Sequence, residues 1–316
     1  MSEKHLIMNI ENVIILGSGP AGLTASIYAA RSDLNPILIS GSTPGGQLTI
    51  TSLVENYPGF EDGILGPELM LNMQKQAKNM GVRFEEGVVI KVDFSKKPFT
   101  IWTEDKEFKT KTIIISTGAS VRWLGLDGET RLMGKGVSGC ATCDGPFFKD
   151  KDIVVVGGGD SSMEEALFLT KFVRKIYLVH RRDEFRASKV MQDRVFKDEK
   201  IEILFNSELK DIYGESVVEG VKILNNKINT ESDLRVQGVF IAIGHTPNTE
   251  IFKEFLDIDT NGYIKVHDFT KTNIEGVFAA GDVSDPKYKQ AISSAGIGCI
   301  AAIDAMHFIE DLDPRI

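Results

Sequence analysis

The chain has 316 residues, of which 42% are hydrophobic and 26% are charged, and this length and composition suggest a soluble globular protein of about two domains. Its net charge of −9 argues against nucleic-acid binding, which needs a basic face, and no apolar run reaches the ~18 residues of a membrane span. With only three cysteines there is no disulfide framework, so we expect a reducing, cytoplasmic setting in which a C-x-x-C pair is catalytic or metal-binding.

The first predicted element is a strand at residues 13–16, and the N-terminal stretch that leads into it lacks the features of a signal peptide. Its continuous apolar run, VIIL, is typical of a strand buried on both faces. Gly17, Gly19 and Gly22 follow in G-x-G-x-x-G spacing and open the alanine-rich run LTASIYAAR, which we expect to be helical. A tight turn in an unrelated α/β unit could carry these glycines, but the strand–loop–helix context favours a site for a dinucleotide pyrophosphate.

The second predicted strand, PILIS, departs from the usual dinucleotide-binding pattern. An acid that binds the adenosine ribose is expected at the end of this strand. The strand ends instead at Ser40 and Gly41, and Asp33 precedes it and is badly placed. The sequence therefore predicts that the ribose is held in another way.

The segment SGCATCDGPFF places Cys140 and Cys143 in C-x-x-C spacing, with Asp144 directly behind them. A structural zinc site needs four ligands, but Cys299 is the only other cysteine, in an apolar stretch where we expect it to be buried, and no two histidines are paired at helical spacing. A structural disulfide across so short a loop would add little stability. These observations favour a redox-active dithiol at the start of a helix or turn. A helix N-terminus at this position would lower the pKa of a thiol.

Asp144 has the opposite effect on the thiols, because a carboxylate beside Cys143 raises the pKa of that cysteine. An acid at this position makes more sense as a proton carrier, since exchange between dithiol and disulfide also moves protons. The alternative is a simple turn residue before Gly145 and Pro146.

A second strand–glycine loop–helix pattern follows in KDIVVVGGGDSSMEEALFL. The strand is predicted at residues 153–156, Gly157 and Gly159 occupy the first two glycine positions, and Ser162 stands at the third. The next strand, KIYLV, ends in a basic cluster at the place where an NAD site carries an acid. Such a cluster fits a 2′-phosphate and favours NADP, although basic runs are often only solvated surface. Its members are His180, Arg181, Arg182 and Arg186.

Two dinucleotide folds in one chain indicate two nucleotides, a nicotinamide and a flavin. Near the C-terminus, residues 277–280 predict a short strand ending at Gly281, followed by Asp282 in a turn. Asp282 could accept a hydrogen bond from a ribityl hydroxyl or could only cap the turn. The next helix, QAISSAGIGCIAAIDAMHF, could direct its N-terminus at the flavin and stabilise the negative charge of the reduced ring.

Over residues 12–308 the chain resembles the bacterial-type (low-molecular-weight) thioredoxin reductases, in GSGPAG, GGQL, VENYPG, STGA, CATCDG, GGGDSS, HRRDEFRA, AIGHTPNT and FAAGDV. The resemblance implies an α/β fold of two dinucleotide-binding (Rossmann-like, three-layer) domains. An NADPH domain at residues 122–248 carries the C-x-x-C and is inserted into an FAD domain made of residues 1–121 and 249–316. It also implies a homodimer, and rotation of the NADPH domain about crossovers near Arg122 and Asn248.

The same resemblance implies the reaction and the roles of the site residues. Electrons would pass from NADPH through FAD to the cysteine pair and then to oxidised thioredoxin. Cys143 would face the flavin, Cys140 would attack the partner's disulfide and Asp144 would act as acid and base; no metal is implied. The implied FAD contacts are Gly17, Gly19, Pro20, Ala21, Gly22, Gly46, Gln47, Leu48, Asn56, Thr117, Gly118, Gly281, Asp282, Gln290 and Ala291. The implied NADPH contacts are Gly157, Gly159, Asp160, Ser161, His180, Arg181, Arg182 and Arg186.

Lys289 stands where many members of that family have an arginine, so the contact made there can differ. Three other functions are compatible with parts of this sequence. A flavoprotein dithiol oxidase that uses O₂ would lack an NADPH site, which the basic cluster argues against. A reductase of the same fold could act on another disulfide, and a sensor of redox state or NADP would not need the cysteine pair with its acid.

Overall fold

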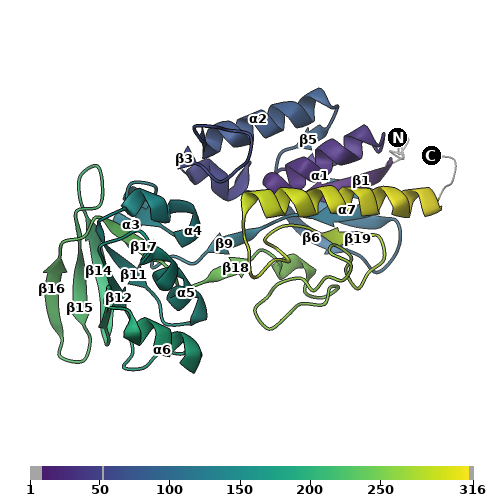
Figure 1. Cartoon of the computed structure of the whole chain (residues 1–316). Helices are drawn as coiled ribbons and strands as arrows, with labels where there is room; N and C mark the ends of the chain where they lie inside the picture. The colour runs from purple at the N-terminus through teal and green to yellow at the C-terminus, as the bar shows by residue number, and fades with distance from the viewer. Residues whose placement is uncertain (1–8, 52, 313–316) are drawn as a thin grey trace. The chain divides into compact units, whose positions relative to one another are not determined.

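The computed structural model describes residues 9–51 and 53–312, and the chain divides into two compact units, each with its own pair of hydrophobic cores (Figure 1). The discontinuous unit comprises Met1–Ser120 and Thr246–Ile316, and the inserted unit comprises Val121–His245. The sequence placed these boundaries after residues 121 and 248. The N-terminal stretch before residue 9, for which no signal peptide was expected, lies outside the described residues.

The discontinuous unit is built on a seven-stranded sheet in the order β5-β2-β1-β8-β7-β6, with β19 also paired to β8. β1 pairs in parallel with β2 and β8, whereas β6, β7 and the first half of β8 form an antiparallel meander. The second half of β8 pairs in parallel with β19, so this long strand serves two neighbours on one edge. The strands are β1 (Ile10–Leu16), β2 (Ile37–Ile39), β5 (Arg83–Glu85), β6 (Val89–Asp93), β7 (Phe99–Thr103), β8 (Glu107–Ile115) and β19 (Val277–Ala279).

Alternate side chains of β1 enter two different cores, as expected for a strand buried on both faces. Val13 and Ile15 belong to the core formed with the helices α1, α2 and α7, and Ile14 and Leu16 belong to the core on the other face. The remaining elements of this unit are α1 (Pro20–Arg31), η1 (Gly46–Ile50), β3 (Leu53–Val54), β4 (Ile64–Leu65), α2 (Gly66–Asn79), η3 (Glu250–Phe252) and α7 (Ala291–Leu312).

α7 packs along α1 through small residues such as Gly298, whose Cα leaves no room for a side chain against the Ala21 backbone. Within the described part of the chain, α7 is the one helix that is long and apolar enough to cross a membrane. This is weak evidence for a span, because core helices of soluble proteins have the same length and composition.

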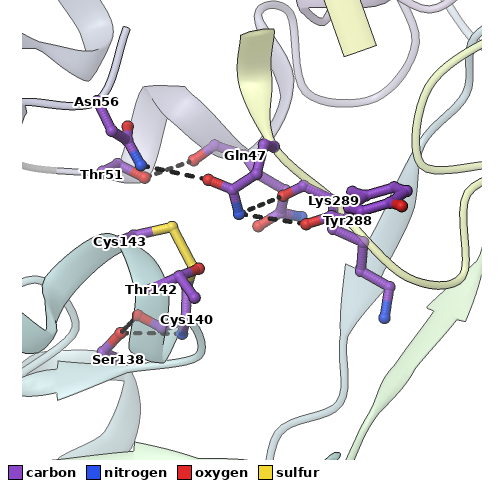
Figure 2. Close-up of a disulfide and its surroundings, with 10 residues drawn as sticks. Gln47, Thr51, Asn56, Ser138, Cys140, Thr142, Cys143, Tyr288 and Lys289 are labelled. Carbon is purple, nitrogen blue, oxygen red and sulfur yellow. Dashed lines mark hydrogen bonds between the residues drawn. A yellow bond between two sulfur atoms is a disulfide. The ribbon is translucent and has the colours of Figure 1, made fainter. Parts of the chain in front are cut away.

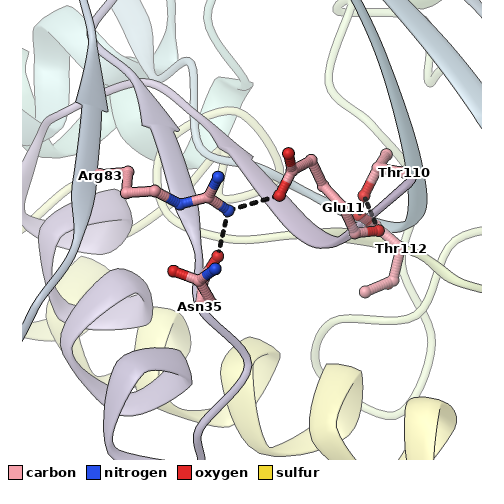
Figure 3. Close-up of polar contacts among 5 residues, drawn as sticks. All are labelled: Glu11, Asn35, Arg83, Thr110 and Thr112. Carbon is pink, nitrogen blue, oxygen red and sulfur yellow. Dashed lines mark hydrogen bonds and ion pairs between the residues drawn. The ribbon is translucent and has the colours of Figure 1, made fainter. Parts of the chain in front are cut away.

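A polar cluster fastens the edge strand β5 at the end of the sheet opposite the first glycine loop (Figure 3). The Arg83 guanidinium pairs with Glu11 of β1 and donates a hydrogen bond of 2.5 Å to the backbone oxygen of Asn35. The Thr110 hydroxyl lies within hydrogen-bonding distance of two backbone oxygens, those of Glu11 (3.2 Å) and Thr112 (2.9 Å). These contacts connect β1, β5 and β8 across the strand starts.

The inserted unit is built on a parallel sheet in the order β10-β17-β11-β12-β13, covered by helices on one face and by the antiparallel sheet β14-β15-β16 on the other. Ile153 and Val155 face the helices, and Val154 and Val156 face the antiparallel sheet. The elements are α3 (Asp127–Arg131), β10 (Val137–Ser138), α4 (Ala141–Asp144), η2 (Gly145–Phe148), β11 (Asp152–Val156), α5 (Asp160–Leu169), β12 (Lys175–Val179), α6 (Lys189–Lys197), β13 (Ile201–Leu204), β14 (Ser207–Tyr213), β15 (Gly220–Asn225), β16 (Thr230–Leu234) and β17 (Gly238–Ile241).

The two crossover segments of the chain pair with each other as a two-stranded sheet of β9 (Ala119–Val121) and β18 (His245–Pro247). The Arg122 N–H donates to the oxygen of Gly244, and the Asn248 N–H donates to the oxygen of Gly118. The prediction of an α/β fold with two Rossmann-like domains is confirmed, and the antiparallel sheet of the inserted unit is an addition that the sequence analysis did not foresee.

Candidate active site

The first glycine loop joins β1 to α1 and leaves open space at its middle glycine. Gly17 has a φ of +104° and lies against the Ser116 backbone, and a side chain at Gly22 would clash with the oxygen of Gly17. A Cβ at Gly19, by contrast, would meet nothing within 4 Å. Gly17 and Gly22 are therefore required by the protein's own packing, whereas Gly19 leaves room for a phosphate at the start of α1.

The hydroxyl of Ser18 connects this loop to two neighbouring segments. It donates a hydrogen bond of 2.8 Å to the backbone oxygen of Ser40 and accepts one of 3.0 Å from the N–H of Gly45. Gly46 then approaches the first glycine loop so closely that its Cβ would lie 3.5 Å from the Cα of Gly19. Ser40, at the position of the usual ribose acid, thus contributes its backbone to the framework of the loop.

The turn after β19 places a half-buried carboxylate beside the same loop. Gly281 has a φ of +80°, and its Cβ would lie 2.9 Å from the Cβ of Ala21, so a side chain is excluded there. The next residue, Asp282, accepts a hydrogen bond of 2.9 Å from the Ser294 hydroxyl on α7. Burial raises the pKa of Asp282, against the lowering effect of that bond. Such a carboxylate is suited to bind a ligand hydroxyl.

The start of α7 lies near Asn56, whose side-chain amide donates a hydrogen bond of 3.2 Å to Gln290 Oε1 (Figure 2). The residue before Gln290, Lys289, has a φ of +50° and its ammonium lies 5.7 Å from the centre of the Tyr263 ring. The cation at this position therefore contacts an aromatic ring of its own unit.

Thr117, at the first crossover, makes hydrogen bonds with another segment of the protein itself. Its hydroxyl donates to the backbone oxygen of Asn248, and the side-chain amide of Asn248 donates back to the Thr117 oxygen, both at 2.8 Å. The neighbouring Gly118 has a φ of +68° and open space at its Cβ position. The remaining residues expected at the flavin lie in other elements of the discontinuous unit: Pro20 at the first position of α1, Gln47 and Leu48 in η1, and Ala291, which begins α7.

The second glycine loop repeats the arrangement of the first between β11 and α5. A side chain at Gly157 would clash with Ser162, whereas a Cβ at Gly159 would meet nothing within 4 Å. Ser162 is fully buried, and its hydroxyl donates a hydrogen bond of 2.7 Å to the oxygen of Gly159. A small residue at the third position therefore does the packing that glycine does at position 22. Ser161 follows Asp160 in the first turn of α5 and is exposed.

The basic cluster lies on a loop that is fastened to this second glycine loop. The N–H of Arg186 donates to the oxygen of Gly158, and Asp160 accepts hydrogen bonds from both the N–H and the hydroxyl of Ser188. These two bonds lower the pKa of Asp160. Arg181, Arg182 and Arg186 are exposed. The loop that carries the three arginines is thus bonded to the second glycine loop, within the inserted unit.

His180 lies beneath the basic loop and not on its surface. The ring packs against Phe185 and Phe205, which also contact each other, and Nε2 lies 2.9 Å from the backbone oxygen of Glu184. A side chain at Gly158 would clash with the ring. Burial lowers the pKa of His180, which favours the neutral imidazole. His180 therefore supports the loop, a role that the sequence pattern did not distinguish from ligand binding.

Cys140 and Cys143 form a disulfide at the N-terminus of α4 (Figure 2). The N–H of Cys140 donates a hydrogen bond of 3.0 Å to the Ser138 hydroxyl, and the Thr142 hydroxyl lies 3.4 Å from Cys140 Sγ. The prediction that the pair sits at the start of a helix is confirmed. Among the described residues no group of three His, Cys, Asp or Glu side chains could hold a metal ion, and Cys299 is half-buried instead of fully buried.

Asp144 closes α4 and is half-buried beside the pair. Burial raises the pKa of its carboxyl, and a hydrogen bond with Ser138 acts in the opposite direction. A carboxyl with a raised pKa can hold a proton closer to neutral pH and pass it to a neighbouring sulfur.

Comparison with known proteins agrees with this combination of two glycine loops and a disulfide. Residues 11–298 match the family of pyridine nucleotide-disulphide oxidoreductases. Proteins named thioredoxin reductase from Streptomyces coelicolor and Rickettsia conorii are 51% and 52% identical over 96% and 94% of this chain, and over 95% and 97% of their own. The chain belongs to the thioredoxin reductases of this family.

A solved structure points to the same conclusion. The thioredoxin reductase from Streptococcus pyogenes is 42% identical, with a TM-score of 0.92 over 96% of this chain and 99% of its own. The resemblance drawn from the sequence is therefore confirmed, and a disulfide oxidoreductase that uses a flavin and a pyridine nucleotide follows from the family. Three hydroxyls that support the loops of this thioredoxin reductase, those of Ser18, Ser138 and Ser188, were not predicted from the sequence. Ser18 lies inside the motif GSGPAG, and Ser138 lies two residues before CATCDG. Their positions in or beside these motifs are the signal that could have identified them.

Proposed function

We propose that the chain uses NADPH to reduce the Cys140–Cys143 disulfide and then transfers the two electrons to oxidised thioredoxin. The observation that carries this proposal is the disulfide at the start of α4, with a half-buried carboxyl one residue behind it. When bound, FAD would supply the two-electron relay between the nicotinamide and the disulfide.

FAD fits the discontinuous unit because that unit offers open space at Gly19 beside the start of α1, and a half-buried carboxylate at Asp282 whose pKa is raised by burial. The pyrophosphate would lie against the backbone of Gly19, and Asp282 would accept a hydrogen bond from a ribityl hydroxyl. Gly46, Asn56 and Gln290 would line the remainder of the site. No acid ends β2, so the adenosine ribose would be held by backbone groups near Ser40.

NADPH fits the inserted unit because three exposed arginines follow β12, on a loop bonded to the second glycine loop. Guanidinium groups bind a 2′-phosphate through paired, charge-assisted hydrogen bonds. Arg182→Ala should therefore raise KM for NADPH about tenfold or more while leaving KM for NADH unchanged. Equal losses with both nucleotides would contradict the assignment.

The chemistry at the cysteines can be written as two thiol–disulfide exchanges. The Cys140 thiolate attacks the thioredoxin disulfide, forming a mixed disulfide and releasing one thioredoxin thiolate. The Cys143 thiolate then attacks Cys140 Sγ, which releases the second thioredoxin thiolate and restores the Cys140–Cys143 bond. Asp144 takes a proton from a thiol of the reduced pair as that thiol becomes the attacking thiolate, and passes the proton to a leaving thioredoxin sulfur.

The chain would act as a cytoplasmic homodimer. Supporting the dimer, α1 and α7 expose apolar side chains at Tyr28, Ile292 and Ile303, which a second copy could cover. Light scattering after size-exclusion chromatography would then give twice the chain mass of 34.8 kDa. A mass of one chain would rule the dimer out.

The first experiment is an anaerobic NADPH titration of the purified protein, followed by addition of thioredoxin and a thiol reporter. Bleaching of the flavin spectrum by NADPH, with sustained reporter turnover only when thioredoxin is present, would support the proposal. Bleaching without thioredoxin-dependent turnover would keep the cofactors and point to another disulfide substrate. If NADPH does not bleach the spectrum, the dithiol oxidase becomes the better description.

A further inference from the structure

Glu129 is a buried carboxylate that the proposed chemistry does not use. It lies on α3 and is only 1% exposed. Its Oε1 accepts a hydrogen bond of 2.9 Å from the N–H of Leu124, and its Oε2 accepts one of 2.8 Å from the N–H of Gly125. Both carboxylate oxygens therefore hold the backbone of the loop that follows β9.

α3 is itself a fixed support for this carboxylate. A side chain at Gly128 would clash with the backbone oxygen of Ile212, so α3 lies directly on β14. Leu124 and Leu126, on either side of the held backbone, pack against the core that includes Leu132 and Ile212. The loop at residues 122–125 is thus fixed from both its backbone and its side chains.

The fixed loop touches the segment that enters the disulfide. A Cβ at Gly139 would lie 2.9 Å from Val121 Cγ1 and 3.5 Å from Trp123 Cη2. Gly139 is not in the left-handed region, so glycine is needed there for space and not for its φ. Val121 and Trp123 therefore form a surface that sets the path of the backbone immediately before Cys140.

Gly139 is also the single residue between the paired strand β10 and Cys140. Ser138 pairs with Phe240 of β17, and its hydroxyl accepts the hydrogen bond from the Cys140 N–H. The segment is anchored on one side by this strand, and on its other side it rests against Val121 and Trp123.

We infer that Glu129 is a positioning residue for the Cys140–Cys143 pair, acting through Val121, Trp123 and Gly139. The carboxylate fixes the loop, the loop presents the two side chains, and the side chains hold the backbone at Gly139. The kinetic consequences rest on the proposed thioredoxin reductase activity, whereas the packing and the reactivity of the disulfide do not.

The first test replaces the carboxylate by an amide, Glu129→Gln, with Asp127→Asn as its matched control. An amide has one acceptor oxygen, so one of the two loop N–H groups loses its partner. Asp127 is exposed on the same helix, and its replacement makes the same change in charge. We expect kcat with thioredoxin to fall about tenfold for Glu129→Gln, with KM for NADPH unchanged, because small displacements of reacting groups have large effects.

Two further readouts separate positioning from a general loss of structure. Turnover of NADPH with a one-electron acceptor that takes electrons directly from the flavin should stay within about twofold of wild type, because it does not need the disulfide. The rate at which dithiothreitol reduces the Cys140–Cys143 bond, measured by quenched alkylation and mass spectrometry, should rise about tenfold as the segment opens more often.

The second test is a double-mutant cycle that does not touch Glu129. Gly139→Ala should reproduce both effects, because the new methyl group meets Val121. Val121→Ala alone should change both rates in the same direction but less than Gly139→Ala, because Trp123 still supports the segment. Val121→Ala with Gly139→Ala should bring both rates back at least to those of Val121→Ala, because the new methyl group then has room.

The outcomes distinguish this inference from the proposed function. Wild-type rates for Glu129→Gln in both the thioredoxin and dithiothreitol assays would overturn the inference and leave the function intact. Equal losses in the disulfide and flavin readouts, or no rescue in the double mutant, would also overturn it. If the wild-type protein does not reduce thioredoxin but the dithiothreitol rates follow the expected cycle, the function fails and the inference stands.

Discussion

At the residue scale, chemistry depends on which partners a side chain meets, and this separates Asp144 from Asp160. Both are aspartates beside motif residues, but the carboxylate of Asp160 is occupied by two hydrogen bonds from Ser188, which lower its pKa. Asp144 is half-buried next to the disulfide, and burial raises its pKa. Of the two, Asp144 keeps its proton to the higher pH and is the one suited to exchange it with a neighbouring sulfur.

Asp144→Asn tests this difference. Because the pKa of Asp144 is raised, its protonated form persists to a higher pH than that of an exposed aspartate, and activity that needs this proton is lost as pH rises through the raised value. We expect the asparagine variant to bind the flavin normally, to lose about 100-fold in kcat with thioredoxin and to lack that descending limb of the pH profile. Unchanged turnover or an unchanged pH profile would contradict the role.

The partners of individual polar side chains could not be predicted from the sequence. His180, Asp160 and Thr117 all lie in motifs that were expected to bind nucleotides, yet each side chain makes contacts inside the protein. A motif gives the position of a polar residue along the chain. Whether that residue faces a ligand or a backbone oxygen of its own protein depends on tertiary contacts such as Gly158 against the His180 ring, which no local pattern contains.

At the scale of elements, the two strand–loop–helix units were predictable because their signals are local. VIIL and IVVV are continuous apolar runs, and each is followed by glycines at the required spacing. The antiparallel sheet β14-β15-β16 was not predicted: β16 is TESDL, almost wholly exposed, and lacks the apolar pattern of a strand. Its pairing with β15 is a tertiary feature.

Each glycine in the second loop has its own reason, and two variants separate them. Gly159→Ala should fold with unchanged thermal stability, because its Cβ meets nothing, and should raise KM for NADPH about tenfold or more if the pyrophosphate lies there. Gly157→Ala should instead lower the melting temperature, because its Cβ would clash with Ser162. Differential scanning calorimetry and NADPH kinetics measure the two effects. A normal KM for Gly159→Ala would place the pyrophosphate elsewhere.

Arg83→Met tests the cluster that fastens β5. The variant keeps much of the apolar stem but removes the pair with Glu11 and the hydrogen bond to Asn35. We expect the free energy of unfolding to fall by about 1 kcal/mol, since the arginine is partly exposed and solvent screens its charge. Urea denaturation measures this, with Lys97→Met as a control at the more exposed ion pair with Glu275. Equal, negligible losses in both variants would show that the cluster contributes nothing.

At the scale of the whole molecule, the chain has two separate pairs of cores, one pair in each unit. A ligand stabilises the part of a protein that it binds, so each nucleotide should protect its own unit against local opening. The assignment of one nucleotide to each unit can therefore be measured by protection from hydrogen exchange, independently of catalysis.

Hydrogen exchange with NADP⁺ makes that measurement. At about 100 times its Kd, NADP⁺ should slow exchange by up to about 100-fold at residues 157–188 and leave residues 17–22 unchanged. NAD⁺ at the same concentration is the matched control, and its protection should be weaker because it lacks the 2′-phosphate. Equal protection of both glycine loops by NADP⁺ would contradict the assignment of one nucleotide to each unit.

The pairing of β9 with β18 has a consequence for how such a chain can be assembled. The backbone leaves the discontinuous unit and returns to it at neighbouring points, with the Arg122 N–H bonded to Gly244 and the Asn248 N–H bonded to Gly118. Residues 121–245 are therefore an insertion whose two ends lie side by side, at the β9–β18 pair. A segment of this kind can be lengthened, replaced by a homologous module or deleted and bridged by a short linker while the host sheet keeps its strand order. The two crossover segments, β9 and β18, are therefore the positions at which one domain could be exchanged for another by gene fusion.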